Sequence, residues 1–253
     1  LEARPDGGVY ALSIPRAPYR CPPGPYERAC MVADYFKKNK PKSKVLILDA
    51  NDDIQSKKAL FMKAWKDNYD GMIEYRPKHT VVDVDVASNT LKFEFNDDLK
   101  VAVANAIPNM RAGDIAVKSG LATANKRWCE VDFLTFESIA VKNVHVLGDA
   151  IQIAPGMPKS GHMANQHGKT CAAAVVALLT GQQVPQMPVY ANTCYSFVTP
   201  EEVVHVASVH AYSAEKKTML TVQGSGGVSK AASELEGKYA LAWARNIWAD
   251  TLA

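Results

Sequence analysis

The chain has 253 residues, enough for two modest domains with a sizeable buried core. Hydrophobic residues make up 47% and charged residues 22% of it, and the net charge is +3, which is the composition of an ordinary globular protein. Because basic and acidic residues are mixed along the chain and no apolar run reaches the roughly 18 residues of a membrane span, we expect neither a nucleic-acid-binding protein nor a membrane-spanning one.

The N-terminal part alternates strand and helix patterns in the way typical of an α/β domain. Gly8–Ile14 predicts a strand, and a proline-rich loop then leads into a helix over residues 25–40. Val45–Asp49 is a short apolar run that predicts a strand buried on both faces, and the apolar spacing over residues 54–65 predicts a second helix. Together these elements predict a crossover unit of a parallel sheet.

The rest of the chain shows strand patterns around one long helix. A hairpin is expected over residues 82–95, and further strands over 99–104 and Val144–Asp149. A helix begins at Gly161 and ends before Gly181. After residue 188 we expect short β-like runs and then a final helical stretch that contains Trp243 and Trp248.

The end of the strand predicted at 144–149 and the start of the next helix together suggest a cofactor site. A carboxylate at a strand end can accept hydrogen bonds from ribose or ribityl hydroxyls, and a helix N-terminus stabilises anionic charge through its free N–H groups. The candidate positions are Gly148, Asp149 and Ala150 at the strand end and Lys159, Ser160, Gly161 and His162 at the helix start. A simple strand-end turn, in which Asp149 caps a neighbouring group, is the alternative that the pattern leaves open.

A second candidate is Cys21, which begins the rigid loop Cys21-Pro22-Pro23-Gly24-Pro25 directly before a helix. A thiolate is favoured at such a helix N-terminus. Glu27, in the first turn of the same helix, is placed to handle protons. A buried structural cysteine is the alternative interpretation of an isolated thiol.

Cysteine spacing excludes the common metal sites. The cysteines are Cys21, Cys30, Cys129, Cys171 and Cys194. They contain no CxxC pair, so we expect no zinc or iron–sulfur centre. Cys194 lies in the segment Tyr190–Ser196, just after the long helix, and a disulfide to Cys21 is one of several pairings that the sequence allows.

The Gly148-Asp149 turn, the Cys21 loop and the Cys194 segment together resemble the flavoprotein subunit of flavocytochrome c sulfide dehydrogenase, a relative of the sulfide:quinone oxidoreductases. The similarity runs from about Gly7 to the C-terminus and is most specific around the two cysteines. It implies the α/β fold of disulfide-reductase-like flavoproteins with a C-terminal α+β interface domain. The implied domains are a middle NAD-binding-like domain over 1–113, the second part of an FAD-binding domain over 114–186, and the interface domain over 187–253.

The resemblance also implies the chemistry. Cys21 and Cys194 match two redox cysteines that lie over the flavin ring as a disulfide, which sulfide attacks. Electrons then pass through FAD to a c-type cytochrome subunit, which carries the haem c. Glu27 matches a residue considered to handle protons, and Trp248 matches a tryptophan near the flavin. The complex implied is a periplasmic heterodimer, in a compartment where a disulfide can persist.

Two departures from the family pattern concern nucleotide binding. The chain has no GxGxxG fingerprint, so the segment that holds the FAD adenylate is missing, and we expect a part of a longer chain that cannot hold FAD alone. Asp49, Asp52 and Asp53 also stand where an NADH-binding relative is expected to have glycines. These carboxylates would repel a pyrophosphate, so we expect pyridine-nucleotide binding to be lost.

Two alternative functions remain at this point. A sulfide:quinone oxidoreductase would use a membrane quinone, but the C-terminal stretch 239–248 is apolar with little of the basic charge that a membrane-docking segment carries. A non-catalytic assembly module without flavin would agree with the missing fingerprint. It would leave the Cys21 and Cys194 segments without a role.

Overall fold

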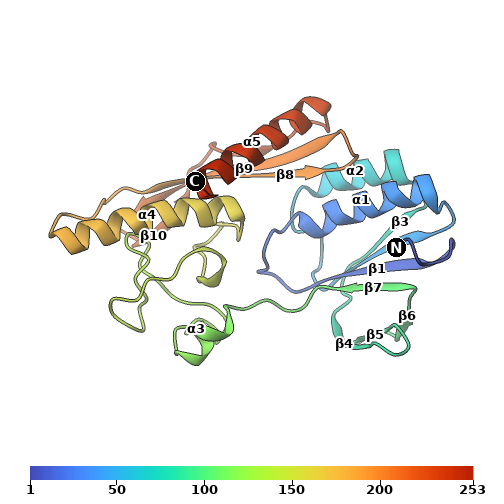
Figure 1. The fold of residues 1–253 in the computed structure, drawn as a ribbon, viewed down its shortest axis with the longest axis horizontal. Coiled ribbons are helices and arrows are strands. Elements are labelled where there is room, and N and C mark those ends of the chain that lie inside the picture. The colour runs from blue at the N-terminus through green and yellow to red at the C-terminus, as the bar shows by residue number, and fades with distance from the viewer. Residues whose placement is uncertain (253) are drawn as a thin grey trace. The chain divides into compact units, whose positions relative to one another are not determined.

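The computed structural model describes residues 1–252 and divides the chain into two units (Figure 1). Unit 1 consists of residues 1–109, 195–205 and 228–246, and unit 2 consists of residues 110–194, 206–227 and 247–253. Strands β8 (Val189–Phe197) and β9 (Val203–Ser213) and helix α5 (Glu234–Leu252) each contribute residues to both units. The C-terminal part of the chain therefore supplies both units rather than only one.

Unit 1 is built on a parallel four-stranded sheet. In spatial order its strands are β3 (Ile73–Arg76), β2 (Lys44–Asp49), β1 (Val9–Ile14) and β7 (Val103–Ala106). Helices α1 (Gly24–Asn39) and α2 (Lys58–Tyr69) connect successive strands and lie on one side of the sheet in Figure 1. The predicted crossover unit is confirmed, and the strand order is that of half a doubly wound nucleotide-binding fold.

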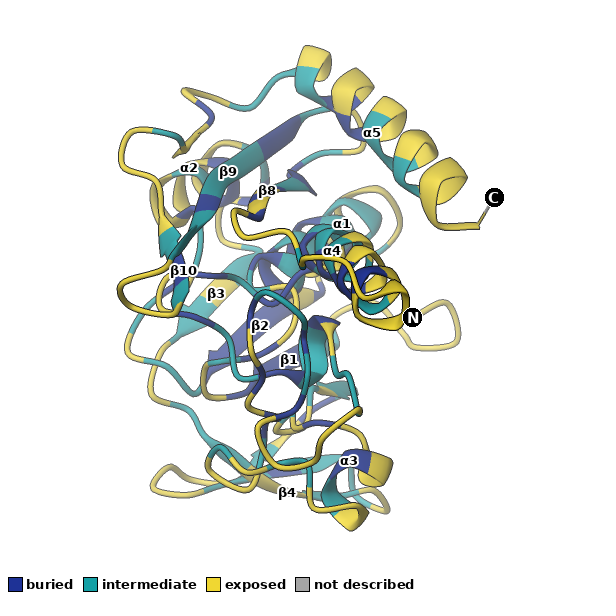
Figure 2. Cartoon of the chain, turned by 90° about the vertical axis from the view of Figure 1, so that its left-hand side faces the viewer, coloured by how far each residue is buried: buried dark blue, intermediate teal, exposed yellow. Residues whose placement is uncertain are grey.

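Both faces of this sheet are covered, as the apolar runs of β1 and β2 predict. On one face, Ala11, Leu46 and Leu48 pack in one cluster with Leu91 and Val101 from the region of a small antiparallel sheet. On the other face, aromatic rings from α1 and α2 pack against one another at centroid distances of 5.5–6.4 Å. Figure 2 shows β1 and β2 as buried strands at the centre of this arrangement.

The small antiparallel sheet confirms the predicted hairpin but corrects one strand. Its strands are β4 (Val81–Asp85), β5 (Thr90–Phe93) and β6 (Leu99–Lys100). The single strand expected over 99–104 is wrong, because the chain passes from β6 to β7 at this point. The N–H of Val101 donates to the carbonyl of Asn89 in the hairpin turn, whereas the N–H of Ala102 donates to Val9 in the parallel sheet. Backbone pairing therefore changes sheets between two adjacent residues.

Strand β2 ends in Asp49, whose side chain is fully buried. Its carboxylate accepts hydrogen bonds from the hydroxyl groups of Tyr26 (2.7 Å) and Tyr75 (3.1 Å). It also accepts from the backbone N–H (2.9 Å) and side-chain amide (2.7 Å) of Asn51. A buried carboxylate needs such a full set of donors, and this one joins α1 and β3 to the end of β2.

Unit 2 contains the long helix expected from the sequence. Its further elements are α3 (Asp114–Lys118), a 3₁₀ turn at Gly148–Ala150, α4 (Gly161–Thr180) and β10 (Thr218–Thr221). Ser160 caps α4 by accepting the N–H of Met163 at 3.1 Å, and Gly181 ends the helix with a φ of 69°. Both ends of the predicted helix are therefore confirmed, with the residues expected to start and stop it.

The strand predicted at Val144–Asp149 is wrong. This segment makes one isolated antiparallel bridge, between Glu137 and His145, and then enters the 3₁₀ turn. The N–H of Val146 donates to Phe136, so pairing involves only a few residues. Gly148, with a φ of 69°, turns the chain before a ladder can continue.

The β-like runs expected after residue 188 are longer than predicted. Strands β8 and β9 have 9 and 11 residues, and β9 pairs with β8, β10 and β11 (Gly227–Val228). Polar residues such as His205 and Ser208 interrupt the apolar pattern of β9 but do not end it. Pairing partners on both sides extend the strand beyond what its side-chain pattern indicates.

The core of unit 2 includes a histidine among aromatic rings. His167 is 1% exposed, and its ring lies 4.8 Å from that of Phe136 and 5.2 Å from that of Tyr190. Its Nδ1 accepts the N–H of Gly148 at 3.3 Å, while its Nε2 is buried without an acceptor among the described residues. Burial lowers the pKa of His167 to about 4, because an imidazolium could not be solvated there.

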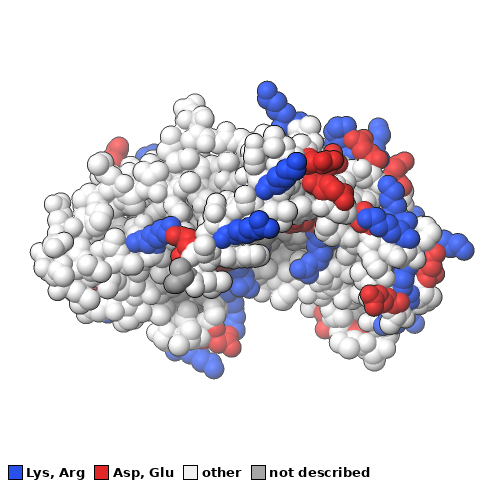
Figure 3. Space-filling view, turned by 45° about the horizontal axis from the view of Figure 1, so that its top comes forward, with Lys and Arg blue, Asp and Glu red and all other residues white. Residues whose placement is uncertain are grey.

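The surface carries charges of both signs. Figure 3 shows acidic and basic side chains next to one another on the face drawn. Several form ion pairs, such as Lys38–Asp34 and Lys63–Asp67. On this face the charges therefore do not form an extended field of one sign. Within residues 1–252, no helix is long and apolar enough to cross a membrane.

We expect the replacement Tyr26→Phe to lower the free energy of unfolding by about 2 kcal/mol, because it leaves the buried Asp49 carboxylate without its shortest tyrosine donor. Urea unfolding followed by circular dichroism measures this loss. The matched control is Tyr35→Phe on the same helix, which should change stability by no more than about 0.5 kcal/mol. Equal losses in both variants would show that the Tyr26–Asp49 hydrogen bond does not stabilise unit 1.

His167 should make stability pH-dependent. The unfolded chain binds a proton on this residue near pH 6.5 and the folded chain only near pH 4, so acidification between these values favours unfolding. A shift of this size corresponds to a loss of about 3 kcal/mol. In His167→Phe, the midpoint of urea unfolding should vary less between pH 7 and pH 4 than in the parent. His79→Phe, at a partly exposed position in unit 1, should retain the parental pH dependence.

Candidate functional site

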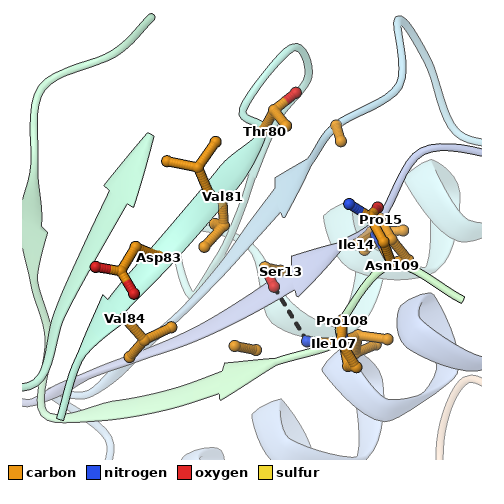
Figure 4. Close-up of a pocket in the computed structure, with 13 residues that line it drawn as sticks. Ser13, Ile14, Pro15, Thr80, Val81, Asp83, Val84, Ile107, Pro108 and Asn109 are labelled. Atoms are coloured by element: carbon orange, nitrogen blue, oxygen red, sulfur yellow. Dashed lines mark hydrogen bonds between the residues drawn. The ribbon is translucent and has the colours of Figure 1, made fainter. Parts of the chain in front are cut away.

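The carboxyl edge of the parallel sheet in unit 1 is where this fold binds nucleotides. A cavity of about 230 Å³ lies there (Figure 4), lined by the end of β1, by residues 80–84 at the start of β4 and by residues 106–109. The labelled side chains include Val81, Val84 and Pro108, and Ser13 Oγ accepts the N–H of Ile107 at 3.1 Å. The cavity is small and much of its lining is apolar.

The turn after β1 is unsuited to phosphate. In this topology the phosphate-binding glycines belong to the turn between β1 and α1, not to the end of β2, where Asp49 was expected to replace one. Residues 15–23 contain four prolines and no glycine, and proline has no N–H to donate to a phosphate. The expectation that Asp49 repels a pyrophosphate is wrong, because its carboxylate is turned inward to Tyr26 and Tyr75.

Cys21 lies at the N-terminus of α1, as predicted. Its side chain is exposed, its φ is 52°, and its carbonyl accepts the N–H of Gly24 at 2.9 Å. A Cβ added to Gly24 would lie 3.0 Å from the sulfur of Cys21. The sulfur is therefore packed against the first residue of α1, where the helix dipole stabilises a thiolate.

Glu27 lies in the first turn of α1 and is half-buried. Its Oε1 accepts the backbone N–H of Phe197, in β8, at 2.8 Å. Burial raises the pKa of Glu27 above its usual range, while that hydrogen bond and the positive charge of Lys57 oppose the rise. A carboxyl group with a raised pKa keeps its proton to higher pH than an exposed glutamate does, which suits a group that exchanges protons.

In unit 2, the turn Gly148–Ala150 packs directly on α4. A Cβ added to Gly148 would lie 3.3 Å from that of Ala164, so a glycine allows both the positive φ and the close approach. The half-buried Asp149 occupies the middle of this turn. The turn and the first part of α4 are thereby held side by side.

Lys159 fixes this turn from inside. Its side chain is 2% exposed, and its ammonium donates to the carbonyls of Asp149 (3.0 Å) and Ile151 (2.6 Å). The ammonium also lies 3.6 Å from the centroid of the Trp128 ring, in a cation–π contact. Lys159 therefore acts on the predicted cofactor site by holding the backbone of the Asp149 turn.

The start of α4 is joined to the strand that carries Cys194. Ser160 Oγ, which caps α4, donates to Asn192 Oδ1 at 2.6 Å, and both side chains are buried. His162 Nδ1 accepts the N–H of Thr193 at 3.1 Å. The structure therefore brings three predicted residues, Ser160, His162 and Cys194, into one region.

Asn192 and Thr193, which the sequence analysis did not single out, make this connection. The amide of Asn192 lies 3.6 Å from the half-buried sulfur of Cys194. A signal was present in the sequence, because an asparagine at an inward position of a strand is buried only when its amide has partners. The hydrogen bonds run from the N–H of Met163 through Ser160 and Asn192 to Cys194.

Trp248 lies on α5 and is 62% exposed. The same end of α5 is bound to α4, because Asp250 accepts from Lys169 and Asn165, each at 2.8 Å. An exposed indole on a fixed helix end can contact a cofactor or a partner. Its contact with flavin stays a prediction.

The predicted site residues divide between the two units. Cys21 and Glu27 belong to unit 1, and the other predicted residues belong to unit 2. Each group is ordered within its own unit by the hydrogen bonds described above. The disulfide between Cys21 and Cys194 stays a prediction.

The groups in unit 2 fit a flavin. Asp149 offers a carboxylate to a polyhydroxyl chain, and the first N–H groups of α4 have no acceptor within the helix. A Cβ added to Gly161, the first residue of α4, would meet no atom within 4 Å, so the backbone there is open to a ligand. An accepting carboxylate next to donating N–H groups suits hydroxyl groups beside an anionic ring.

Two family models match the chain. Residues 1–108 match "sulfide dehydrogenase (flavocytochrome c) flavoprotein chain, central", and residues 186–252 match "flavocytochrome c sulphide dehydrogenase, flavin-binding". The two matches describe parts of the same protein, and together they cover most of the chain.

Solved structures show the same fold at low sequence identity. The sulfide:quinone oxidoreductase of Aquifex aeolicus has a TM-score of 0.69 and 14% identity, over 96% of this chain and 58% of that one. A chain in the mitochondrial ATP synthase tetramer of Tetrahymena thermophila has a TM-score of 0.63 and 16% identity, over 81% of this chain and 51% of that one. This chain thus spans little more than half the length of either protein. On the strength of its two family matches, it belongs to the flavoprotein chains of flavocytochrome c sulfide dehydrogenase.

Proposed function

We propose that this chain is part of a flavoprotein that oxidises sulfide through a redox-active disulfide between Cys21 and Cys194. The electrons pass through FAD to a c-type cytochrome subunit, in the periplasm. Family membership supports a flavoprotein sulfide dehydrogenase in general terms. The disulfide, the cytochrome acceptor and the compartment are parts of the proposal.

The observation that carries this proposal is the attachment of Cys194 to the helix start that fits a flavin. Asn192 contacts both the sulfur of Cys194 (3.6 Å) and the hydroxyl of Ser160 (2.6 Å), the residue that caps α4. A cysteine with only a packing role needs no such polar connection to a cofactor-binding helix. The arrangement supports a sulfur that works together with the flavin.

The sulfur chemistry balances with the residues present. A hydrosulfide anion attacks one sulfur of the disulfide, so that a new S–S bond forms a persulfide and the other cysteine leaves as a thiolate. The helix N-terminus beside Cys21 and the amide beside Cys194 both stabilise negative charge on sulfur. FAD, when bound, accepts two electrons and can release them one at a time to a haem.

Glu27 is the proton-handling group in this proposal. Because burial raises the pKa of its carboxyl group, it can take up the proton of an incoming sulfide and release it again. The backbone N–H of Phe197 fixes the direction of the carboxylate at 2.8 Å. Glu27 therefore contributes a positioned acid–base group rather than a structural ion pair.

The turn after β1 supports a cytochrome acceptor over a pyridine nucleotide. Prolines replace the N–H donors that a pyrophosphate requires, so NADH should neither bind to this domain nor reduce the flavin.

Anaerobic addition of sulfide to the flavin-loaded protein should bleach the flavin absorption band, and NADH should not. Bleaching by NADH alone would overturn the proposal. Faster turnover with a soluble quinone than with cytochrome c would show that the electron acceptor is a quinone and not a cytochrome.

We expect Cys21→Ser and Cys194→Ser each to abolish sulfide oxidation while flavin stays bound, because either change removes the disulfide that sulfide attacks. Sulfide-dependent reduction of cytochrome c and the flavin absorption spectrum measure the two properties. Cys171→Ser, which changes a buried thiol of α4, is the matched control and should retain turnover. Full turnover in both site variants would contradict the disulfide mechanism.

A further inference from the structure

Lys57 has an unusual position for a lysine. It is 7% exposed, and it precedes α2 with a φ of 54°, in the left-handed region where side chains other than glycine and asparagine are strained. Burying an ammonium and straining its backbone both cost free energy. A residue in this situation persists only where its contacts hold it.

The contacts of Lys57 lead to β8. Its ammonium donates to Ser196 Oγ at 2.8 Å and to the carbonyl of Val204 at 3.3 Å. Ser196 and Val204 are both fully buried. The ammonium also lies 5.6 Å from the centroid of the Phe61 ring. The side chain therefore joins the start of α2 to the neighbouring strands β8 and β9.

Glu27 binds the next residue of the same strand. The N–H of Phe197 donates to Glu27 Oε1 at 2.8 Å, directly after the residue that receives the ammonium of Lys57. Consecutive residues of β8 thus hold a buried cation and a half-buried carboxylate. The positive charge of Lys57 acts on the carboxyl group of Glu27, and because both groups are at least partly buried, water screens their attraction less than it would at the surface.

We propose that Lys57 is a positioning residue for sulfide oxidation: its ammonium fixes Ser196 and Phe197 next to Glu27 and supplies the positive charge that allows this carboxyl group to release its proton. This inference rests on the proposed function, in which Glu27 handles protons. It adds a residue that makes no contact with the reacting atoms and acts through Glu27.

Among the described residues, the cation whose charge acts on Glu27 is Lys57. Glu27 also interacts with the N–H of Phe197, in β8, and with the thiol of Cys30, on α1. Burial raises the pKa of Cys30 to about 12, so this thiol stays neutral over the working range. Removal of the Lys57 charge leaves burial opposed only by one hydrogen bond. The pKa of Glu27 should then rise further.

The test compares Lys57→Met with Lys58→Met in the flavin-loaded protein. Lys58 is the next residue, and its exposed ammonium pairs with Asp53. Carbon-13 NMR of labelled glutamate carboxyl groups, assigned with Glu27→Gln, gives the pKa of Glu27. The pH profile of sulfide-dependent cytochrome c reduction gives the effect of this pKa on turnover.

In Lys57→Met, both the carboxyl titration and the acidic limb of the profile should move to higher pH by about one unit. Lys58→Met should move neither, and Lys57→Arg should restore both.

The outcomes separate this inference from the proposed function. An unchanged titration of Glu27 in a folded Lys57→Met variant would overturn the role of Lys57. A titration that moves while the turnover profile does not would instead remove Glu27 from the mechanism and leave its electrostatic link to Lys57 intact. Where Lys57→Met does not fold, Lys57→Gln keeps a donor for Ser196 and loses only the charge, so the same shifts are expected of it.

Discussion

The hydrogen bond between Ser160 and Asn192 is the interaction on which the candidate site in unit 2 depends. It is 2.6 Å long and buried at both ends, so breaking it would deprive the Ser160 hydroxyl and the Asn192 amide oxygen of a hydrogen bond that water could not replace. Ser160 needs its hydroxyl to cap α4, and Asn192 lies two residues before Cys194, on the same side of β8. One bond therefore sets both the start of the helix that fits a flavin and the place of the sulfur.

Unit 1 is likewise ordered by buried polar groups that need hydrogen-bond partners. Asp49 and Lys57 are buried groups of opposite charge, and each is held by hydrogen bonds from several elements. Asp49 joins α1, β2 and β3 at the edge where a nucleotide would bind in other proteins of this fold. A carboxylate engaged in this way cannot turn outward to a ribose. The carboxyl end of β2 is thus closed by a hydrogen-bonded carboxylate, and the acid–base group that we propose for this domain is Glu27, in the first turn of α1.

Much of the fold could be predicted from the sequence because its signals are local. The apolar runs of β1 and β2, Pro25 in the first turn of α1 and Gly181 after α4 each act within a few residues. The strand expected at 144–149 failed because its apolar residues pack without a neighbouring strand to pair with over their length. The length of β9 was missed for the converse reason, since pairing on both sides extends a strand that its polar residues would end.

Local sequence signals also predicted only some of the residues of the candidate site. Cys21 and Glu27 were found because Cys21 begins a loop of distinctive composition directly before α1 and Glu27 lies in the first turn of that helix. Asn192 and Lys57 were missed because their partners, Ser160 and Ser196, lie 32 and 139 residues away in the chain. Such pairs have no period or spacing, and only the folded chain brings them together. Their common property is a polar or charged side chain buried at a strained or strand position, which costs free energy unless a partner is present. In the mechanism that we propose for this chain, which uses thiolates and a carboxyl group, such compensated burials control the protonation of the reacting groups.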